Sequence, residues 1–229
     1  MKLNNVTLIC VEGSNDINSI NDSVKALLIS SKDIEFNSIV LVSSAKPVNL
    51  PEKIKHYTIP SMTWLEYNQF IVSELTNYVE TEFCILIQPD GFIINSNVWT
   101  DDFLKYDYIG HVWDFVNLPY HLPGVDPSVV EKKGIENLNR VGNGGFSLRS
   151  KKLLQATSTI VDKCEKGEDV FICNDRFDYL IEKGILFGTV EIARLFSEDP
   201  NVHFCKSYQP TFGFHGDKNL INLFDVSIA

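Results

Sequence analysis

Residues 83–94 read Phe83-Cys84-Ile85-Leu86-Ile87-Gln88-Pro89-Asp90-Gly91-Phe92-Ile93-Ile94, and this stretch decides the fold. It opens with an apolar run, rich in β-formers and too short to span a membrane, which is typical of a strand covered on both faces of a sheet. Pro89 cannot donate to a sheet ladder, and Gly91 permits a sharp turn directly after Asp90. We therefore expect a central strand that presents Gln88 and Asp90 at its carboxyl end, where ligands bind in open α/β sheets. The alternative is an ordinary Pro-Asp-Gly turn, because these residues favour turns for local reasons.

The residues before this stretch alternate between strand and helix patterns. Buried strands are predicted at residues 6–11, 38–43 and 56–59, and helices at residues 23–32 and 63–79. In the second helix, apolar residues recur at three- and four-residue steps, which is the spacing of an amphipathic helix. This order of elements is typical of a mostly parallel α/β sheet flanked by helices, and the length of 229 residues fits a single domain.

The residues after this stretch have a less regular pattern of strands and helices. We expect, in order, a strand at 108–113, a long and weakly periodic loop at 117–139, helices at 151–164 and 168–183, and a strand at 185–190. Gly184 is placed to cap the second of these helices. Long loops in compact domains tend to be functional or mobile.

The balance of charges favours some partners and excludes others. The formal net charge is −10 and the pI is near 4.9. Nucleic-acid binders carry a basic stripe, which this sequence lacks, so we expect no nucleic-acid partner. An acidic protein that handles an anionic substrate needs a local positive element, and a divalent cation would supply it.

The cysteines and the hydropathy pattern indicate a cytoplasmic protein. The five cysteines are dispersed without C-x-x-C spacing, as reduced core thiols would be: Cys10, Cys84, Cys164, Cys173 and Cys205. No apolar signal core precedes the first strand, and no apolar run approaches the length of a transmembrane segment, so we expect neither secretion nor membrane spanning.

Residues 142–146 place three glycines in four positions between strand-like residues. Glycines at Gly144 and Gly145 remove side chains, so a ligand can approach the backbone and meet N–H groups there. A β-bulge or a hairpin turn explains the same residues equally well.

Two further features carry possible chemistry. Glu168 and Asp169 open a predicted helix, where the helix dipole favours acids for purely structural reasons but also keeps a carboxylate ionised, as a general base requires. His215 lies between glycines in an aromatic segment, and a lone histidine of this kind is more often structural than catalytic.

The sequence resembles the GT-A fold glycosyltransferases in the order and spacing of four landmarks: Gln88-Pro89-Asp90, Gly142-Asn143-Gly144-Gly145-Phe146, Gly167-Glu168-Asp169 and His215. In that superfamily a D-x-D motif ends a central strand, and a glycine-rich loop, an x-E-D motif and a late metal-binding histidine follow. Residues 88–92, 141–148, 168–171 and 212–216 also resemble a family of bacterial and viral GT-A-like proteins catalogued as a domain of unknown function. The resemblance implies a Rossmann-related fold, with a nucleotide-binding half at residues 1–95 and an acceptor and catalytic half at residues 96–229.

The resemblance also implies a role for each landmark. Asp90 and His215 would bind a divalent metal that bridges the diphosphate of a nucleotide-sugar donor and neutralises it as it leaves. Asp169 would be the general base that deprotonates the acceptor hydroxyl, with Glu168 orienting hydroxyl groups, which gives single displacement with inversion. The donor site would be built from eight residues: Val11, Glu12, Gln88, Asp90, Gly91, Asn143, Gly144 and Gly145.

One landmark departs from the superfamily pattern. Gln88 occupies the first acidic position of the D-x-D motif, and a neutral amide is a poorer metal ligand than a carboxylate. An imidazole ligand such as His215 favours Mn²⁺ over Mg²⁺, since Mg²⁺ prefers oxygen ligands.

Aromatic residues after the deciding stretch are candidates for an acceptor platform, because aromatic faces suit sugar rings. We select Trp113 from a set that core packing explains equally well: Trp99, Tyr106, Tyr108, Trp113 and Tyr120. Arg149, which could meet phosphate, is interpreted as part of a solvated helix start.

The leading hypothesis is a metal-dependent, inverting glycosyltransferase that moves a sugar to a hydroxyl acceptor such as a glycan or surface-polysaccharide precursor. A non-catalytic nucleotide- or sugar-binding module on the same fold is the alternative that Gln88 favours. A sugar-phosphate nucleotidyltransferase ranks lower, because such enzymes carry a glycine-rich loop after the first strand, whereas residues 12–16 contain a single glycine.

Overall fold

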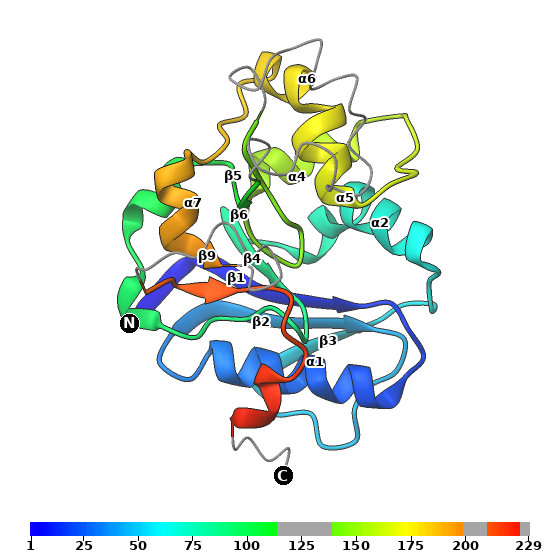
Figure 1. The fold of residues 1–229 in the computed structure, drawn as a ribbon. Helices are drawn as coiled ribbons and strands as arrows, with labels where there is room; N and C mark the ends of the chain where they lie inside the picture. The colour runs from blue at the N-terminus through cyan, green and yellow to red at the C-terminus, as the bar shows by residue number, and fades with distance from the viewer. Residues whose placement is uncertain (114–138, 199–209, 225–229) are drawn as a thin grey trace.

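A computed structural model describes residues 1–113, 139–198 and 210–224 of the chain. Its centre is a six-stranded sheet in the order β3-β2-β1-β4-β8-β5 (Figure 1). The first four strands of that order run parallel, whereas β8 is antiparallel to both of its neighbours. The predicted α/β class, with a mostly parallel sheet flanked by helices, is confirmed.

The first half of the chain builds the parallel strands and the two helices between them. The elements are β1 (Lys2–Glu12), α1 (Ile17–Ser30), β2 (Glu35–Ser43), β3 (Ile54–Thr58), α2 (Trp64–Ser73) and β4 (Phe83–Ile87). Every element predicted in this half is present, but α2 ends six residues early and is followed by a short 3-10 helix, η1 (Leu75–Tyr78). A capping box fixes the start of α2, where Thr63 and Glu66 bond each other's backbone N–H groups.

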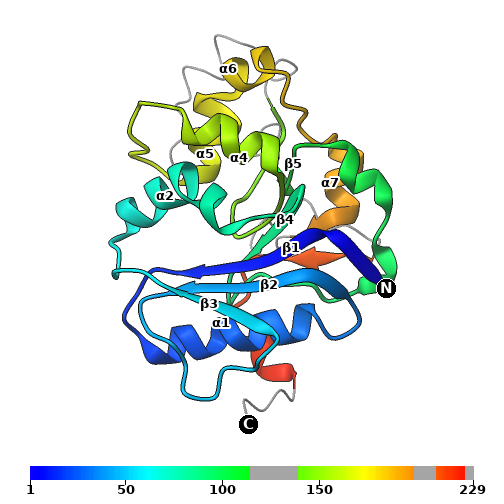
Figure 2. The same cartoon turned by 180° about the vertical axis from the view of Figure 1, so that it is seen from behind.

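Both faces of the sheet are covered, as the apolar run in β4 predicts. Cys84 and Leu86 belong to a cluster on the α2 side, whereas Ile85 and Ile87 belong to a larger cluster on the α1 side. Figure 2 shows α1 on one face of the sheet, with α2 and α4 on the other. This period-two division explains why the strand reads as a continuous apolar run: neither face meets water.

The second half of the chain adds short strands and helices around the end of β4. They are η2 (Ser96–Val98), η3 (Asp101–Lys105), β5 (Tyr108–Ile109), β6 (His111–Val112), β7 (Val141–Gly142), β8 (Phe146–Ser150), α4 (Lys151–Ser158), α5 (Glu168–Val170), α6 (Phe177–Glu182), α7 (Val190–Phe196), β9 (Ser197–Glu198), β10 (Gly213–Phe214) and η6 (Leu220–Leu223). Two small sheets, β6-β7 and β9-β10, lie beside the main one.

Several predictions for this half are corrected by the structure. The strand predicted at 108–113 is divided at Gly110 between two sheets. The backbone of Gly142 approaches so closely there that a Cβ on Gly110 would lie 1.7 Å from the carbonyl oxygen of Gly142. The helix predicted at 168–183 is interrupted by a π-helical turn at Phe171–Asp175, and Gly184 follows its end at a φ of +77°. The strand predicted at 185–190 is reduced to one bridge, Tyr108 to Phe187, before α7 begins.

Four cysteines, Cys10, Cys84, Cys164 and Cys173, are free and buried, as predicted. Cys205, Tyr120 and all but the last residue of the predicted loop at 117–139 lie outside the described residues. Within the part of the chain that is described, no helix is both long and apolar enough to cross a membrane.

Candidate active site

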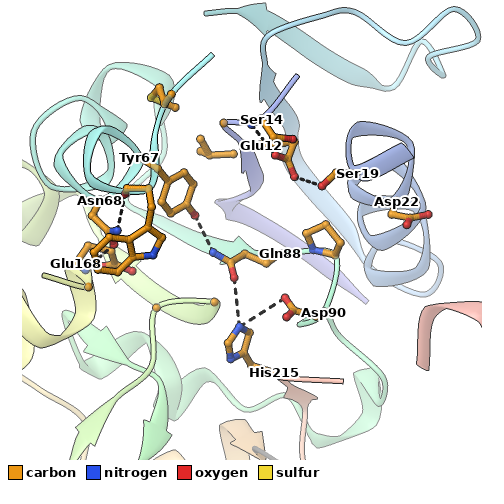
Figure 3. A pocket seen from close by; sticks show the side chains of 18 of the residues that line it. Glu12, Ser14, Ser19, Asp22, Tyr67, Asn68, Gln88, Asp90, Glu168 and His215 are labelled. Carbon is orange, nitrogen blue, oxygen red and sulfur yellow. Dashed lines mark hydrogen bonds and ion pairs between the residues drawn. The ribbon is translucent and has the colours of Figure 1, made fainter. Parts of the chain in front are cut away.

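A pocket of about 690 Å³ opens at the carboxyl ends of β1 and β4. Its walls include six stretches of the sequence: the end of β1 with the loop after it, the first turns of α1, the start of α2 with the two residues before it, the turn after β4, the loop between β7 and β8, and residues 167–169. His215, from the segment after β10, also lines the pocket (Figure 3), together with Lys218 and Ile221. The four landmarks, which are scattered over residues 88–215, therefore meet around one cavity.

The turn after β4 holds the amide and the carboxylate in place. Gln88 and Gly91 exchange both backbone hydrogen bonds, at 3.1 and 3.0 Å, which closes a tight turn around Pro89 and Asp90. The carbonyl oxygen of Asp90 accepts from the backbone N–H of Gly216 at 2.7 Å. The turn and the histidine segment are thus joined through their backbones, far apart as they are in sequence.

Gln88, Asp90 and His215 converge at one side of the pocket. His215 Nε2 lies 3.2 Å from Gln88 Oε1 and 3.6 Å from Asp90 Oδ1. Gln88 Nε2 in turn donates to the Tyr67 hydroxyl at 2.8 Å, so the carbonyl end of the amide faces the histidine (Figure 3). Burial raises the pKa of Tyr67 well above its usual range, which keeps its hydroxyl neutral beside the amide.

A buried ion pair lies at the opposite side of the pocket. Arg149 Nη2 is 2.7 Å from Glu168 Oε1, with side-chain exposures of 0% and 6%. The Arg149 Nε–H also donates to Ser147 Oγ at 3.0 Å. The interpretation of Arg149 as part of a solvated helix start was wrong: it lies in β8 opposite Cys84, beneath the first turns of α2.

The two acids of residues 168–169 differ in their surroundings. Burial raises the pKa of Glu168, and the Arg149 guanidinium opposes that shift. Asp169 is partly exposed and its carboxylate is oriented by backbone groups, accepting from Gly144 N at 3.3 Å and Val170 N at 2.8 Å. The Asp169 carboxylate therefore lines the pocket, and among the described contacts no cationic side chain pairs with it.

The glycines of the loop between β7 and β8 make room for other side chains of the protein. A Cβ on Gly144 would lie 1.7 Å from Glu168 Oε1, and a Cβ on Gly145 would lie 1.9 Å from His215 Nε2. Asn143 holds the turn with a φ of +73°, and its Oδ1 accepts from Gly145 N at 3.1 Å. The expectation that these glycines leave room for a ligand at the backbone is thus incomplete, because the side chains of Glu168 and His215 already occupy the space beside them.

The pocket is strongly acidic. Six carboxylates line it, from Glu12, Asp16, Asp22, Asp90, Glu168 and Asp169, and among its described lining residues Lys218 is the one lysine or arginine. The Glu12 carboxylate is engaged by its own loop, accepting from Ser14 N at 2.8 Å and from the Ser19 hydroxyl. An anionic ligand would need a cation to enter such a cavity.

The predicted site residues can now be placed. Ten line the pocket: Val11, Glu12, Gln88, Asp90, Asn143, Gly144, Gly145, Glu168, Asp169 and His215. Gly91 lies behind them, where a Cβ would meet the His215 ring at 2.8 Å. Trp113 is 5% exposed and packs against Gly142, so its buried ring offers no face to a sugar in the described pocket.

Sequence reasoning missed three residues that the site uses. Arg149 balances Glu168, Tyr67 orients Gln88, and the Asn68 Oδ1 accepts from the Glu168 backbone N–H at 2.8 Å. Tyr67 falls on the apolar face of the amphipathic helix that the sequence predicts at 63–79, so its hydroxyl gave no separate signal. Asn68, next to it in sequence, carried a detectable signal, because it is a polar side chain on a helix packed against the sheet.

The fold is that of a GT-A-like α/β protein. A galactosyltransferase, LgtC, solved with donor and acceptor sugar analogues, aligns with a TM-score of 0.58 at 14% identity over 91% of this chain and 86% of that one. A glycosyltransferase involved in the glycosylation of the major capsid of PBCV-1 aligns with a TM-score of 0.50 at 10% identity, over 95% and 97% of the two chains. At these identities the likeness shows the fold alone.

The family is shown by sequence. The model of a family described as "Protein of unknown function (DUF5672)" matches residues 52–215, most of the chain, and the chain belongs to this family. No curated protein matches this chain. The predicted membership in a family of unknown function is confirmed, and so is the predicted resemblance to GT-A proteins at the level of the fold.

Proposed function

We propose that this protein is a metal-dependent glycosyltransferase that moves a sugar from a nucleotide-sugar donor to a hydroxyl acceptor. The observation that carries the proposal is the convergence of Gln88, Asp90 and His215 on one side of a pocket whose other side holds Glu168 and Asp169. The GT-A-like fold supports the proposal, because LgtC and the PBCV-1 capsid glycosyltransferase share it.

The residues present fit a divalent cation. Asp90 Oδ1, His215 Nε2 and Gln88 Oε1 supply a carboxylate, an imidazole and an amide oxygen, a mixed set that suits Mn²⁺ better than Mg²⁺. Among the described residues, no three His, Cys, Asp or Glu side chains gather to hold a metal on their own. We infer that Asp90 and His215 would hold the ion with help from Gln88, and that oxygen atoms of the donor would complete its ligands. Bound there, the ion supplies Lewis-acid stabilisation of the departing diphosphate.

Asp169 is the residue that we assign as general base. Its carboxylate is oriented by the N–H groups of Gly144 and Val170, and it faces the pocket partly exposed. Glu168 is less suited to proton transfer, because Arg149 already occupies one of its oxygens at 2.7 Å. Glu168 instead orients substrate hydroxyl groups. A base placed across the cavity from the leaving diphosphate favours inversion at the transferred carbon.

The remaining residues would enclose the donor. Val11 and Glu12, at the end of β1, would line the nucleoside side of the cavity, and residues 143–145 would lie along the transferred sugar. In this proposal residues 1–95 bind the nucleotide, and residues 96–229 supply the base and the acceptor side.

Calorimetric titration with UDP and GDP, in Mn²⁺ and in EDTA, tests the proposal. We expect nucleotide binding to require the metal. Asp90→Ala or His215→Ala should weaken that binding by at least about 100-fold, because loss of a direct metal ligand costs more than loss of an outer partner of a ligand. Asp162→Asn, an exposed acid outside the pocket, is the control and should leave binding unchanged. Binding that ignores the metal would contradict the roles of Asp90 and His215.

Gln88 favours a second candidate, a module that binds a nucleotide or sugar without turnover. Its neutral amide leaves a single carboxylate, that of Asp90, beside His215. Incubation with nucleotide sugars separates the two candidates. An enzyme should hydrolyse the donor slowly, and Asp169→Asn should abolish that hydrolysis. A module would bind the same donors and release them intact.

A further inference from the structure

Trp64 presents a large apolar ring to solvent at the edge of the pocket. It is the first residue of α2 and is 62% exposed, yet it belongs to the lining of the cavity. The other tryptophans have packing partners: Trp99 contacts the rings of Phe103 and Phe212, and Trp113 is buried. Core packing therefore does not explain why an indole stands at position 64.

Glu168 lines the same cavity and has an unused hydrogen-bond acceptor. The residue is 4% exposed, and its Oε1 accepts from Arg149. Its Oε2 is buried and has no hydrogen-bond partner among the described residues. A buried charged oxygen without a partner is costly, so this atom is suited to accept from a donor that arrives with a ligand.

Asn68 ties these two residues together. Its Nδ2 donates to the carbonyl oxygen of Trp64 at 2.7 Å, and its Oδ1 accepts from the backbone N–H of Glu168 at 2.8 Å. Asn68 is itself 4% exposed, so these bonds are shielded from water. The first turn of α2 and the backbone of Glu168 are consequently held in a fixed relation, and Arg149 holds the Glu168 carboxylate.

We propose that Trp64 and Glu168 form a subsite for one pyranose ring. The indole covers the apolar C–H face of the ring, and Glu168 Oε2 accepts a hydrogen bond from one of its hydroxyl groups. A ring with an apolar face and hydroxyl donors at its edge matches an aromatic plane beside a fixed carboxylate. The subsite deepens the proposed function and rests on it for the view that the sugar is a substrate. The ring can belong to the acceptor or to the donor, and the same chemistry recognises both.

Nuclear magnetic resonance of the ¹⁵N-labelled full chain tests this subsite directly. The indole N–H signal of Trp64 is assigned from its loss in Trp64→Phe. The probes are the methyl glycosides of galactose, glucose and mannose, each with Mn²⁺ and UDP or GDP present, followed by the corresponding UDP- and GDP-sugars. Glycerol, a polyol without a ring, controls for nonspecific effects of hydroxyl groups.

We expect at least one pyranoside to shift the Trp64 indole and the Gly144 amide together and saturably. A response to free methyl glycosides assigns the subsite to the acceptor, and a response confined to nucleotide sugars assigns it to the donor. Trp64→Ala should weaken the response at Gly144 about fivefold or more, whereas Leu65→Ala, an exposed neighbour outside the pocket lining, should not. Glu168→Gln should weaken it as well.

The proposal is overturned if no sugar moves the Trp64 signal, or if Trp64→Ala binds sugars as the unaltered chain does. Failure of the proposed function looks different, because it removes the effect of UDP and GDP on the amides of the turn after β4. Nucleotide binding that persists without any response at Trp64 therefore rejects the subsite alone.

Discussion

The two sides of the pocket use acidic residues in opposite ways. Glu168 is buried, and its charge is balanced inside the protein by Arg149 at 2.7 Å. Asp90 is about one-fifth exposed, and its partner among the described residues is the His215 imidazole at 3.6 Å, beside the neutral Gln88. On the first side the charge of the acid is balanced once the chain folds, whereas the second side leaves a carboxylate for a cation from solution. An acid's role thus depends on how deeply it is buried and on what already balances its charge.

Asp169, the partly exposed neighbour of Glu168, extends this contrast, and Asp169→Asn is the variant for which we expect the largest effect. Asparagine keeps the size of the side chain and one acceptor for the Gly144 N–H, but it cannot take a proton. We expect kcat for sugar transfer to fall by about 10²–10⁴-fold, the usual contribution of a positioned base, while metal-dependent nucleotide binding is unchanged. Steady-state kinetics, with sugars of the nucleotide that calorimetry selects, measures the first quantity, and calorimetric titration measures the second.

Glu168→Gln separates the neighbouring acid from this role. If Glu168 only orients hydroxyl groups, its amide variant should raise KM more than it lowers kcat. A kcat for Asp169→Asn within twofold of the unaltered enzyme would show that the base lies elsewhere.

The second expected effect is on stability. Arg149→Met leaves the Glu168 carboxylate buried without its cation, and removing one partner of a buried pair costs about 3–5 kcal/mol in the free energy of unfolding. Guanidinium chloride unfolding, followed by circular dichroism, measures the loss. The matched control is Arg176→Met, whose pair with Asp162 has the same 2.7 Å separation but a 66% exposed acid, and it should cost about 1 kcal/mol or less.

The pH dependence of the same variant has a definite sign. Burial already raises the pKa of Glu168 above its unfolded value, and loss of Arg149 raises it further. The folded state then holds a proton that the unfolded state has released, so stability falls as pH rises through the interval between the two pKa values. The deficit of Arg149→Met should therefore be smaller in acid than at neutral pH. A deficit that does not change with pH would mean that packing, not the charge of Glu168, causes it.

Much of the fold could be predicted because its signals are local and repeated. Successive residues from Phe83 to Ile87 contact two different apolar clusters in turn, so the apolar character of each residue is a separate indication of a buried strand. The interrupted helix at 168–183 could not be predicted. The N–H of Arg176 bonds the carbonyl oxygen of Phe171 five residues earlier, and apolar spacing carries no trace of that bond.

The site shows the same division. Asp90, Asp169 and His215 could be predicted because short motifs mark them, whereas Arg149 could not be placed without knowing that β8 pairs antiparallel to β4. That pairing puts Arg149 opposite Cys84 and beneath α2, whereas residues next to it in sequence gave the signal of a helix start. Tyr67 is missed for a related reason, since its ring fits an apolar helix face and only its hydroxyl reaches Gln88.

Tyr67→Phe tests the open side of the pocket with the smallest expected effect. The Tyr67 hydroxyl accepts from Gln88 Nε2 at 2.8 Å, which directs the carbonyl oxygen of the amide toward His215. Without that acceptor the amide can turn its NH₂ group toward the cation position. We expect Mn²⁺-dependent nucleotide binding to weaken about tenfold, the usual cost of losing an outer partner of a metal ligand. Tyr78→Phe, which packs against Phe70 away from the pocket, is the control.

Repeating Tyr67→Phe in a Gln88→Glu background shows whether orientation is the cause. Glutamate has the shape of glutamine but carries oxygen at both ends, so either end can face His215 and the tyrosine is no longer needed to choose between them. The two substitutions should therefore be non-additive, with the tenfold loss largely gone in the double variant. Gln88→Glu alone should tighten Mn²⁺ binding, because it adds a second carboxylate beside Asp90. Equal losses in both backgrounds would mean that Tyr67 acts through packing, and the neutral amide would then be a passive part of a site that Asp90 and His215 form by themselves.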